Sequence, residues 1–244
     1  MDLALLTQSG PEMLFVWIHF LAGITWIGIL YYFNLVQVPF MAEAPAEAKP
    51  GVTRMLLPRA LWWSRWGAMF TLLSGLAIII YWMVLSVNQG GSAMDALNNS
   101  RGVGIMLGAT LGLVMFLNVW LVIWPNQKIV IASANAVAGG GQADPKAANA
   151  GARAFLASRT NFLFSIPLLF FMGNHRITLF SGTPAMSIGV PLGICTAVIA
   201  VVEANALFGT KGKGPAKMLD KHIAVLHVGL VLALAFYLVL DLML

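Results

Sequence analysis

Six ionisable side chains lie inside or at the edges of long apolar stretches of the sequence. They are His19, Arg65, His175, Glu203, His222 and His227. An ionisable group inside a membrane is costly, so each one is a functional hypothesis by default. Neutral imidazole binds haem iron, and a haem held between helices can take histidines from two of them. The four histidines are therefore candidate haem ligands, and the alternative for each is a hydrogen bond to a neighbouring helix.

His19 has the most suitable surroundings for a haem. Gly23, one helical turn further on, leaves room for a flat macrocycle, and Trp17 and Trp26 offer aromatic surface. Copper is another metal that imidazole suits, but the sequence has no Met-x-x-Met or His-x-His cluster. We therefore predict b-type haem as the cofactor, with His19 as one ligand of its iron.

The depths of the other histidines suggest how they could pair. His19 and His175 fall at the outer ends of their apolar stretches, and together they are predicted to ligate one outer haem. His227 lies about 13 Å deeper than His19 at about 1.5 Å per residue, so it is assigned to a second, inner cofactor site. His222 and His227 are turned about 140° apart on a helix and should face different neighbours.

Glu203 lies in the inner part of its apolar stretch and needs a partner there. A carboxylate within a membrane is either protonated or matched with a cation. Arg65, Lys221 and His227 are the candidate cations, so Glu203 and Arg65 form a possible ion-pair site. The open alternative is that Glu203 transfers protons or lies beside a haem propionate.

The composition identifies the class of protein that must position these groups. Only 9% of the 244 residues are charged and 59% are hydrophobic, whereas an ordinary soluble domain carries about 25% charged residues. This composition excludes a soluble hydrolase and argues against a nucleic-acid partner. The single cysteine, Cys195, excludes a disulfide framework, a four-cysteine zinc site and a covalently attached c-type haem.

Six apolar stretches are long enough to cross a bilayer, which takes about 20 residues. They are 13–36, 61–87, 103–124, 155–172, 186–208 and 219–242. The sequence therefore predicts an all-α polytopic membrane helix bundle of about six transmembrane helices, forming a single integral membrane domain over residues 1–244. Pro167 interrupts the fourth stretch, which a membrane helix tolerates when its neighbours satisfy the freed carbonyl.

The charges predict the orientation of the bundle. Twelve of the 14 basic residues lie in or beside the first, third and fifth connections. The positive-inside rule places these connections in the cytoplasm and both termini outside. The outward segments are mildly acidic, which would attract a basic cytochrome. Their charged residues are Asp2, Glu12, Asp95 and Asp241, against Arg101 and Arg176.

Small residues recur at four-residue intervals on two of the predicted helices. They are Gly104, Gly108 and Gly112 on the third, and Gly189, Gly193 and Ala197 on the fifth. Small residues at this spacing let membrane helices approach closely. We expect these faces to pack within the bundle, and the alternative is a homodimer interface.

Several segments, taken in order, carry a family resemblance. They are IHFLAGITWIGILYYFN at 18–34, LWWSRWG at 61–67, WPNQ at 124–127, ASRTN at 157–161, and SIP at 165–167 followed by Asn174-His175. Together they resemble the urate oxidase N-terminal domain family, the membrane part of a bacterial urate hydroxylase that a cytochrome c domain usually follows. The resemblance implies a redox protein of the bacterial inner membrane with urate hydroxylase-like oxidation, and it places His19 and His175 on the histidine-bearing motifs.

The sequence stops at Leu244, soon after the sixth apolar stretch, without a c-type haem motif. The expectation is therefore a b-type-haem redox protein that passes electrons to a separate cytochrome c or to other subunits of a membrane complex. The alternative is a non-catalytic structural or accessory subunit of a larger respiratory or oxygenase complex. A small-solute transporter is the third possibility, but no pair of broken helices with inverted symmetry is visible.

Overall fold

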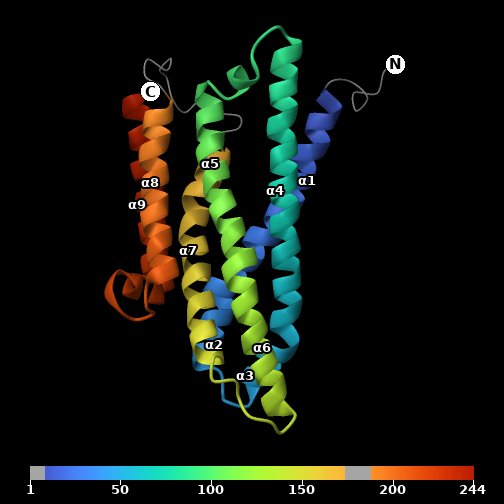
Figure 1. Cartoon of the computed structure of the whole chain (residues 1–244), viewed down its shortest axis with the longest axis vertical. Helices are drawn as coiled ribbons and strands as arrows, with labels where there is room; N and C mark the ends of the chain where they lie inside the picture. The colour runs from blue at the N-terminus through green and yellow to red at the C-terminus, as the bar shows by residue number, and fades with distance from the viewer. Residues whose placement is uncertain (1–8, 174–187) are drawn as a thin grey trace.

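The computed structural model describes residues 9–173 and 188–244 of the chain. Within these two ranges there are six helices long and apolar enough to cross a membrane, and no strand. The predicted all-α membrane helix bundle is confirmed. Helix α1 begins and helix α9 ends at the same end of the bundle (Figure 1), as an even number of crossings requires.

Each of the six membrane-crossing helical stretches is called a rod below. A π-helical segment interrupts three of the six rods. The first rod is α1 (Ser9–Tyr31), a π segment (Tyr32–Gln37) and α2 (Val38–Glu43). The second is α3 (Ala48–Gly51), a π segment (Val52–Leu56) and α4 (Leu57–Asn88). After a 3₁₀ turn (Ala93–Ala96), the third is α5 (Ser100–Leu117), a π segment (Asn118–Ile123) and α6 (Trp124–Ala138). The other three are α7 (Ala147–Gly173), α8 (Gly189–Phe208) and, after a 3₁₀ segment (Gly214–Asp220), α9 (His222–Met243).

Proline explains where the π segments occur. Each one is followed by a proline at the start of the next helix, namely Pro39, Pro58 and Pro125. Proline has no N–H to donate and its ring crowds the carbonyl four residues back, and a wider π turn relieves that contact. Pro167 lies inside α7 without such a segment. Gly229 on α9 lies against the carbonyl of Leu163, four residues before this proline, where a Cβ would come within 3.0 Å of the oxygen.

The first three rods are longer than the membrane is thick. The third runs from Ser100 to Ala138, 39 residues, which is about 58 Å at about 1.5 Å per residue, against a hydrocarbon core of about 30 Å. Helices α8 and α9, with 20 and 22 residues, match the core. In Figure 1 the ends marked α2, α3 and α6 extend well below the connection between α8 and α9. The long rods therefore project beyond the membrane on one side.

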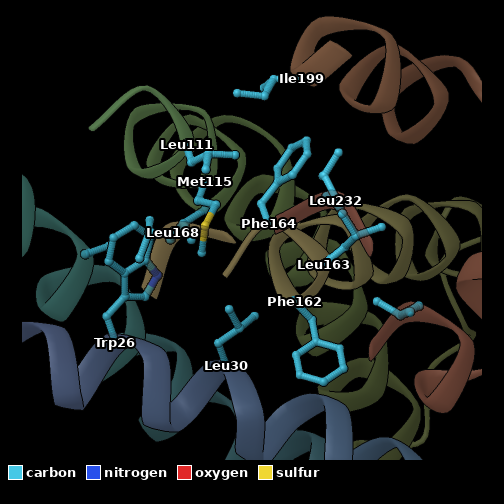
Figure 2. Packing of buried hydrophobic residues seen from close by; sticks show 14 of the residues in the cluster. Trp26, Leu30, Leu111, Met115, Phe162, Leu163, Phe164, Leu168, Ile199 and Leu232 are labelled. Carbon is cyan, nitrogen blue, oxygen red and sulfur yellow. The ribbon is translucent and has the colours of Figure 1, made fainter. Parts of the chain in front are cut away.

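Helix α7 lies at the centre of the bundle. In its most apolar stretch 67% of the residues are buried, against 17–39% for the other five spans. It packs against α1, α5, α6, α8 and α9, whereas α1 packs mainly on α4. Figure 2 shows Trp26 and Leu30 of α1 directed toward the same core as Met115 of α5 and Phe164 of α7. Polar residues midway along α7, such as Arg159 and Asn161, are therefore placed in the interior, whereas Arg153 near its start is exposed.

Glycine permits the closest helix contacts. A Cβ at Gly67 on α4 would lie 3.0 Å from the Trp26 amide nitrogen, so α1 and α4 touch at their backbones there. Gly108 and Gly112 on α5 face Met172 and Leu168 of α7, which confirms packing within the bundle for these two residues of the third predicted helix. For the fifth predicted helix, the expected packing within the bundle is wrong at Gly193, because a Cβ there would meet nothing within 4 Å.

The turn between α4 and α5 is closed by a capping box. The backbone N–H and the hydroxyl of Ser92 both donate to the Asp95 carboxylate, at 2.7 and 2.8 Å. Both hydrogen bonds lower the pKa of the Asp95 carboxyl, and the one from the backbone N–H has the larger effect. Asp95 therefore keeps its negative charge at this end of the bundle in mildly acidic solution.

Candidate functional site

His19 lies half-buried on α1 and faces α4. Its Nδ1 is 3.2 Å from the Ser74 hydroxyl oxygen. The Ser74 hydroxyl has two carbonyl acceptors on its own helix, Phe70 at 2.6 Å and Thr71 at 3.1 Å. With its hydrogen engaged there, the Ser74 oxygen is an acceptor for His19 Nδ1–H. In the neutral ring, Nε2 then carries the lone pair that a metal requires.

Two glycines shape the space around this imidazole. Gly75 on α4 lets the ring approach, because a Cβ there would lie 3.0 Å from His19 Cε1. A Cβ at Gly23, one turn further along α1, would meet nothing within 4 Å. The predicted open space beside His19 is therefore present at Gly23. His19 lines neither the cavity of about 20 Å³ beside Arg65 nor the groove of about 610 Å³ at the start of α9.

His175 lies outside the described residues. Its pairing with His19 at an outer haem stays a prediction that the geometry neither supports nor opposes.

His222 and His227 lie at the start of α9. His227 is exposed, and its Nδ1 is 2.9 Å from the Ile223 carbonyl oxygen. His222 and His227 both line one groove of about 610 Å³, together with Asp220 and Lys221. The two histidines border the same open groove although about 140° of helix rotation separates them.

Glu203 on α8 belongs to a buried chain of amides. Asn118 Nδ2 donates to Glu203 Oε2 and to Asn161 Oδ1, each at 2.9 Å. Asn161 Nδ2 donates in turn to the Met115 carbonyl at 2.9 Å. The structure gives Glu203 an amide partner and does not bring it together with Arg65.

Arg65 on α4 has aromatic partners. Its Cζ lies 3.4 Å from the centre of a Trp124 ring and 5.6 Å from that of Trp120, and its Nε donates to the Leu61 carbonyl. Cation–π contacts of this kind stabilise a partly buried guanidinium without a carboxylate. A cavity of about 20 Å³ lies beside it, lined also by Ser64 and Ser158, and is large enough for a water molecule, which needs about 10–15 Å³.

Among the charged side chains in residues 9–173 and 188–244, Arg159 on α7 is the most buried, with 2% of its surface exposed. Its guanidinium donates to the Asn34 carbonyl at 3.2 Å, and Asn34 Nδ2 donates to the Leu30 carbonyl and to Ser158. Within the described part of the chain, Arg159 Nε and the Thr160 hydroxyl are buried without a hydrogen-bond partner. Polar residues of α7 thus contact both the first and the third π segments.

A family model described as urate oxidase N-terminal matches residues 92–238, well over half of the chain. This chain belongs to the urate oxidase N-terminal family. No curated protein and no solved structure matches it. The resemblance found in the sequence is confirmed for the segments from WPNQ onward, while the segments at 18–34 and 61–67 lie before the matched region.

The family match includes the buried amides that sequence reasoning missed. Asn118 and Asn161, with the predicted Glu203, lie within residues 92–238, whereas His19 and Asn34 precede this region. One signal was available, because the matched ASRTN segment places four consecutive polar residues, 158–161, in an apolar stretch. Their partners lie on other helices, so the spacing along the chain did not reveal the network.

Proposed function

We propose that this member of the urate oxidase N-terminal family is a redox protein that binds b-type haem through His19. The observation that carries the proposal is the Ser74 contact, which favours the tautomer with the proton of His19 on Nδ1 and with Nε2 available. A histidine that binds a metal usually donates its other N–H to a neighbouring acceptor. The open space at Gly23 is the second supporting feature.

His175 is the proposed second ligand, and His227 is not needed for this haem. When bound, the haem supplies one-electron chemistry. Urate hydroxylase-like oxidation is the activity that the family description suggests, and the bacterial inner membrane is its proposed location. The chain's own part is to orient His19 through Ser74 and to admit its ring beside Gly75.

A c-type cytochrome is the proposed electron acceptor. Acidic side chains lie toward the end of the bundle where α1 begins, including Asp95 and Asp241. Glu12 at this end accepts a hydrogen bond from Trp82, and Arg101 lies over the ring of the same tryptophan. The nearby Arg101 guanidinium therefore screens part of the negative charge of Glu12. A basic cytochrome would be steered to this end, more weakly as salt increases.

The second candidate is a non-catalytic subunit of a larger membrane complex. It is favoured by the cavities, since the one of about 20 Å³ cannot hold a haem and the groove of about 610 Å³ lies at the inner end, away from His19.

The haem content of the purified protein separates the two candidates. A reduced-minus-oxidised spectrum with a b-type α-band, and about one haem per chain by pyridine haemochrome assay, is the expected result for the redox protein. A colourless protein that co-purifies with larger subunits would reject the proposal in favour of the second candidate.

A further inference from the structure

An open groove lies beside the start of α9, and a single continuous segment, residues 220–224 together with His227, lines it. Its volume of about 610 Å³ falls in the range of about 300–1,000 Å³ that is usual for ligand pockets. Asp220 and Lys221 precede the helix, His222 begins it, and His227 follows about one and a half turns later. Ile223 and Ala224 supply the apolar part of the lining.

His227 decides which chemical groups the groove can accept. A carbonyl oxygen only accepts hydrogen bonds, so the 2.9 Å contact with Ile223 fixes the donor as His227 Nδ1–H. In the neutral ring, Nε2 is then an acceptor. An acceptor in this position suits a ligand with a hydroxyl group.

The charges around the groove favour a neutral head group. Asp220 and Lys221 are adjacent and carry opposite signs. In its neutral form His227 presents only the acceptor Nε2 to the groove, which offers a phosphate anion no hydrogen bond. A neutral ring with two hydroxyl groups supplies the donor that this nitrogen needs.

An apolar path leads from the groove along the outside of α9. Ile223, Leu230 and Leu234 are all exposed, at 59%, 54% and 58% of their surface. Residues at these spacings share one face of a helix. A ligand with its head in the groove can therefore lay a hydrocarbon tail along this face, in the lipid.

We propose that the groove binds a membrane quinol, a dihydroxybenzene ring with an isoprenoid tail. One hydroxyl donates to His227 Nε2, Lys221 is a donor for the second oxygen, and the tail follows Ile223, Leu230 and Leu234. The site does not depend on a haem at His19. An anionic phospholipid is the competing occupant.

Binding of decylubiquinol to the full-length protein in phosphatidylcholine nanodiscs, kept reduced without oxygen, tests the proposal. His227→Ala should weaken the affinity about tenfold, as expected for one hydrogen bond, and His227→Gln, which keeps an acceptor, should restore part of it. Leu242→Ala is the matched control, because Leu242 is exposed at the other end of α9, and it should bind like the wild type.

Two outcomes would overturn the proposal. One is an affinity of His227→Ala equal to that of the wild type. The other is loss of quinol binding when phosphatidylglycerol replaces phosphatidylcholine in the discs, which would identify a lipid head group as the occupant. His19→Ala should leave quinol binding unchanged, so a failure of the haem proposal would be seen separately.

Discussion

Asn34 and Asn118 each lie in a π segment, and both are buried. Asn34 donates to a main-chain carbonyl and to Ser158, and Asn118 donates to Asn161 and Glu203. Arg159 and Asn161 of α7 donate in return to carbonyls at these interruptions. An unsatisfied polar group costs several kcal/mol in a bilayer, so these side chains are needed where the regular helical pattern is interrupted.

Asn161→Ala should destabilise the protein by about 1–2 kcal/mol, the upper range for a hydrogen bond between membrane helices. The change leaves the Met115 carbonyl and one Asn118 N–H without their partner. Thermal unfolding of the purified protein in detergent measures the effect.

Thr196→Ala is the control for this prediction. Thr196 is exposed on α8 and its hydroxyl bonds only to the Leu192 carbonyl of its own helix, so the change should stay within about 0.5 kcal/mol. Equal losses in the two variants would show that the amide chain contributes nothing specific.

Residue type alone revealed the ionisable candidates but not their partners. His19 and Glu203 stand out in the sequence because charge is rare in apolar stretches. Their partners, Ser74 and Asn118, are uncharged and lie 55 and 85 residues away along the chain. The expected approach of Arg65 to Glu203 did not occur because Trp124, on the third rod, lies next to the guanidinium.

At the scale of elements, hydropathy located all six membrane helices but not their full lengths. It detects the apolar portion of a helix, and the projecting ends of the first three rods are more polar. Helix α6 shows this, because the third predicted span ends at Trp124 whereas the helix continues to Ala138. The prolines at 39, 58 and 125 mark the π segments, yet a proline in a sequence is equally compatible with a kink.

Gly67→Ala should weaken the packing of α1 on α4 by about 1–3 kcal/mol, the usual cost of overpacking. The new methyl group would meet backbone atoms of Trp26 and Ala22, which cannot rotate away. The melting temperature in detergent reports the loss.

Gly28→Ala on α1 provides the comparison. A Cβ at Gly28 meets nothing within 4 Å, and alanine favours a helix over glycine by about 1 kcal/mol. This variant should be as stable as the wild type or more so, and a melting temperature as low as that of Gly67→Ala would refute the role of close approach.

At the scale of the whole molecule, the projecting ends of the rods carry much of the positive charge. The basic residues there lie on α3, the π segment that follows it, α6, the connection from α6 to α7, and the start of α7; they are Lys49, Arg54, Lys128, Lys146 and Arg153. Six crossings return the chain to the end where it began (Figure 1). The positive charge therefore predicts that the projecting end lies in the cytoplasm. The opposite end, where α1 begins and α9 ends, is then outside.

Single-cysteine variants on a Cys195→Ser background test this orientation. Gln89→Cys, at the end of α4, should react with a membrane-impermeant maleimide in intact cells. Gln142→Cys, between α6 and α7, should react only after the inner membrane is permeabilised. Both positions are exposed, whereas Cys195 is buried. The reverse labelling pattern would mean that the chain is inserted the other way round.

The most direct test of the central claim is the optical spectrum of His19→Ala beside that of His222→Ala. If His19 ligates a b-type haem, its replacement should remove or shift the reduced α-band while the protein stays in the membrane. His222→Ala, at the far end of the bundle, should keep the wild-type spectrum. A wild-type b-type spectrum in the His19→Ala protein would contradict the account.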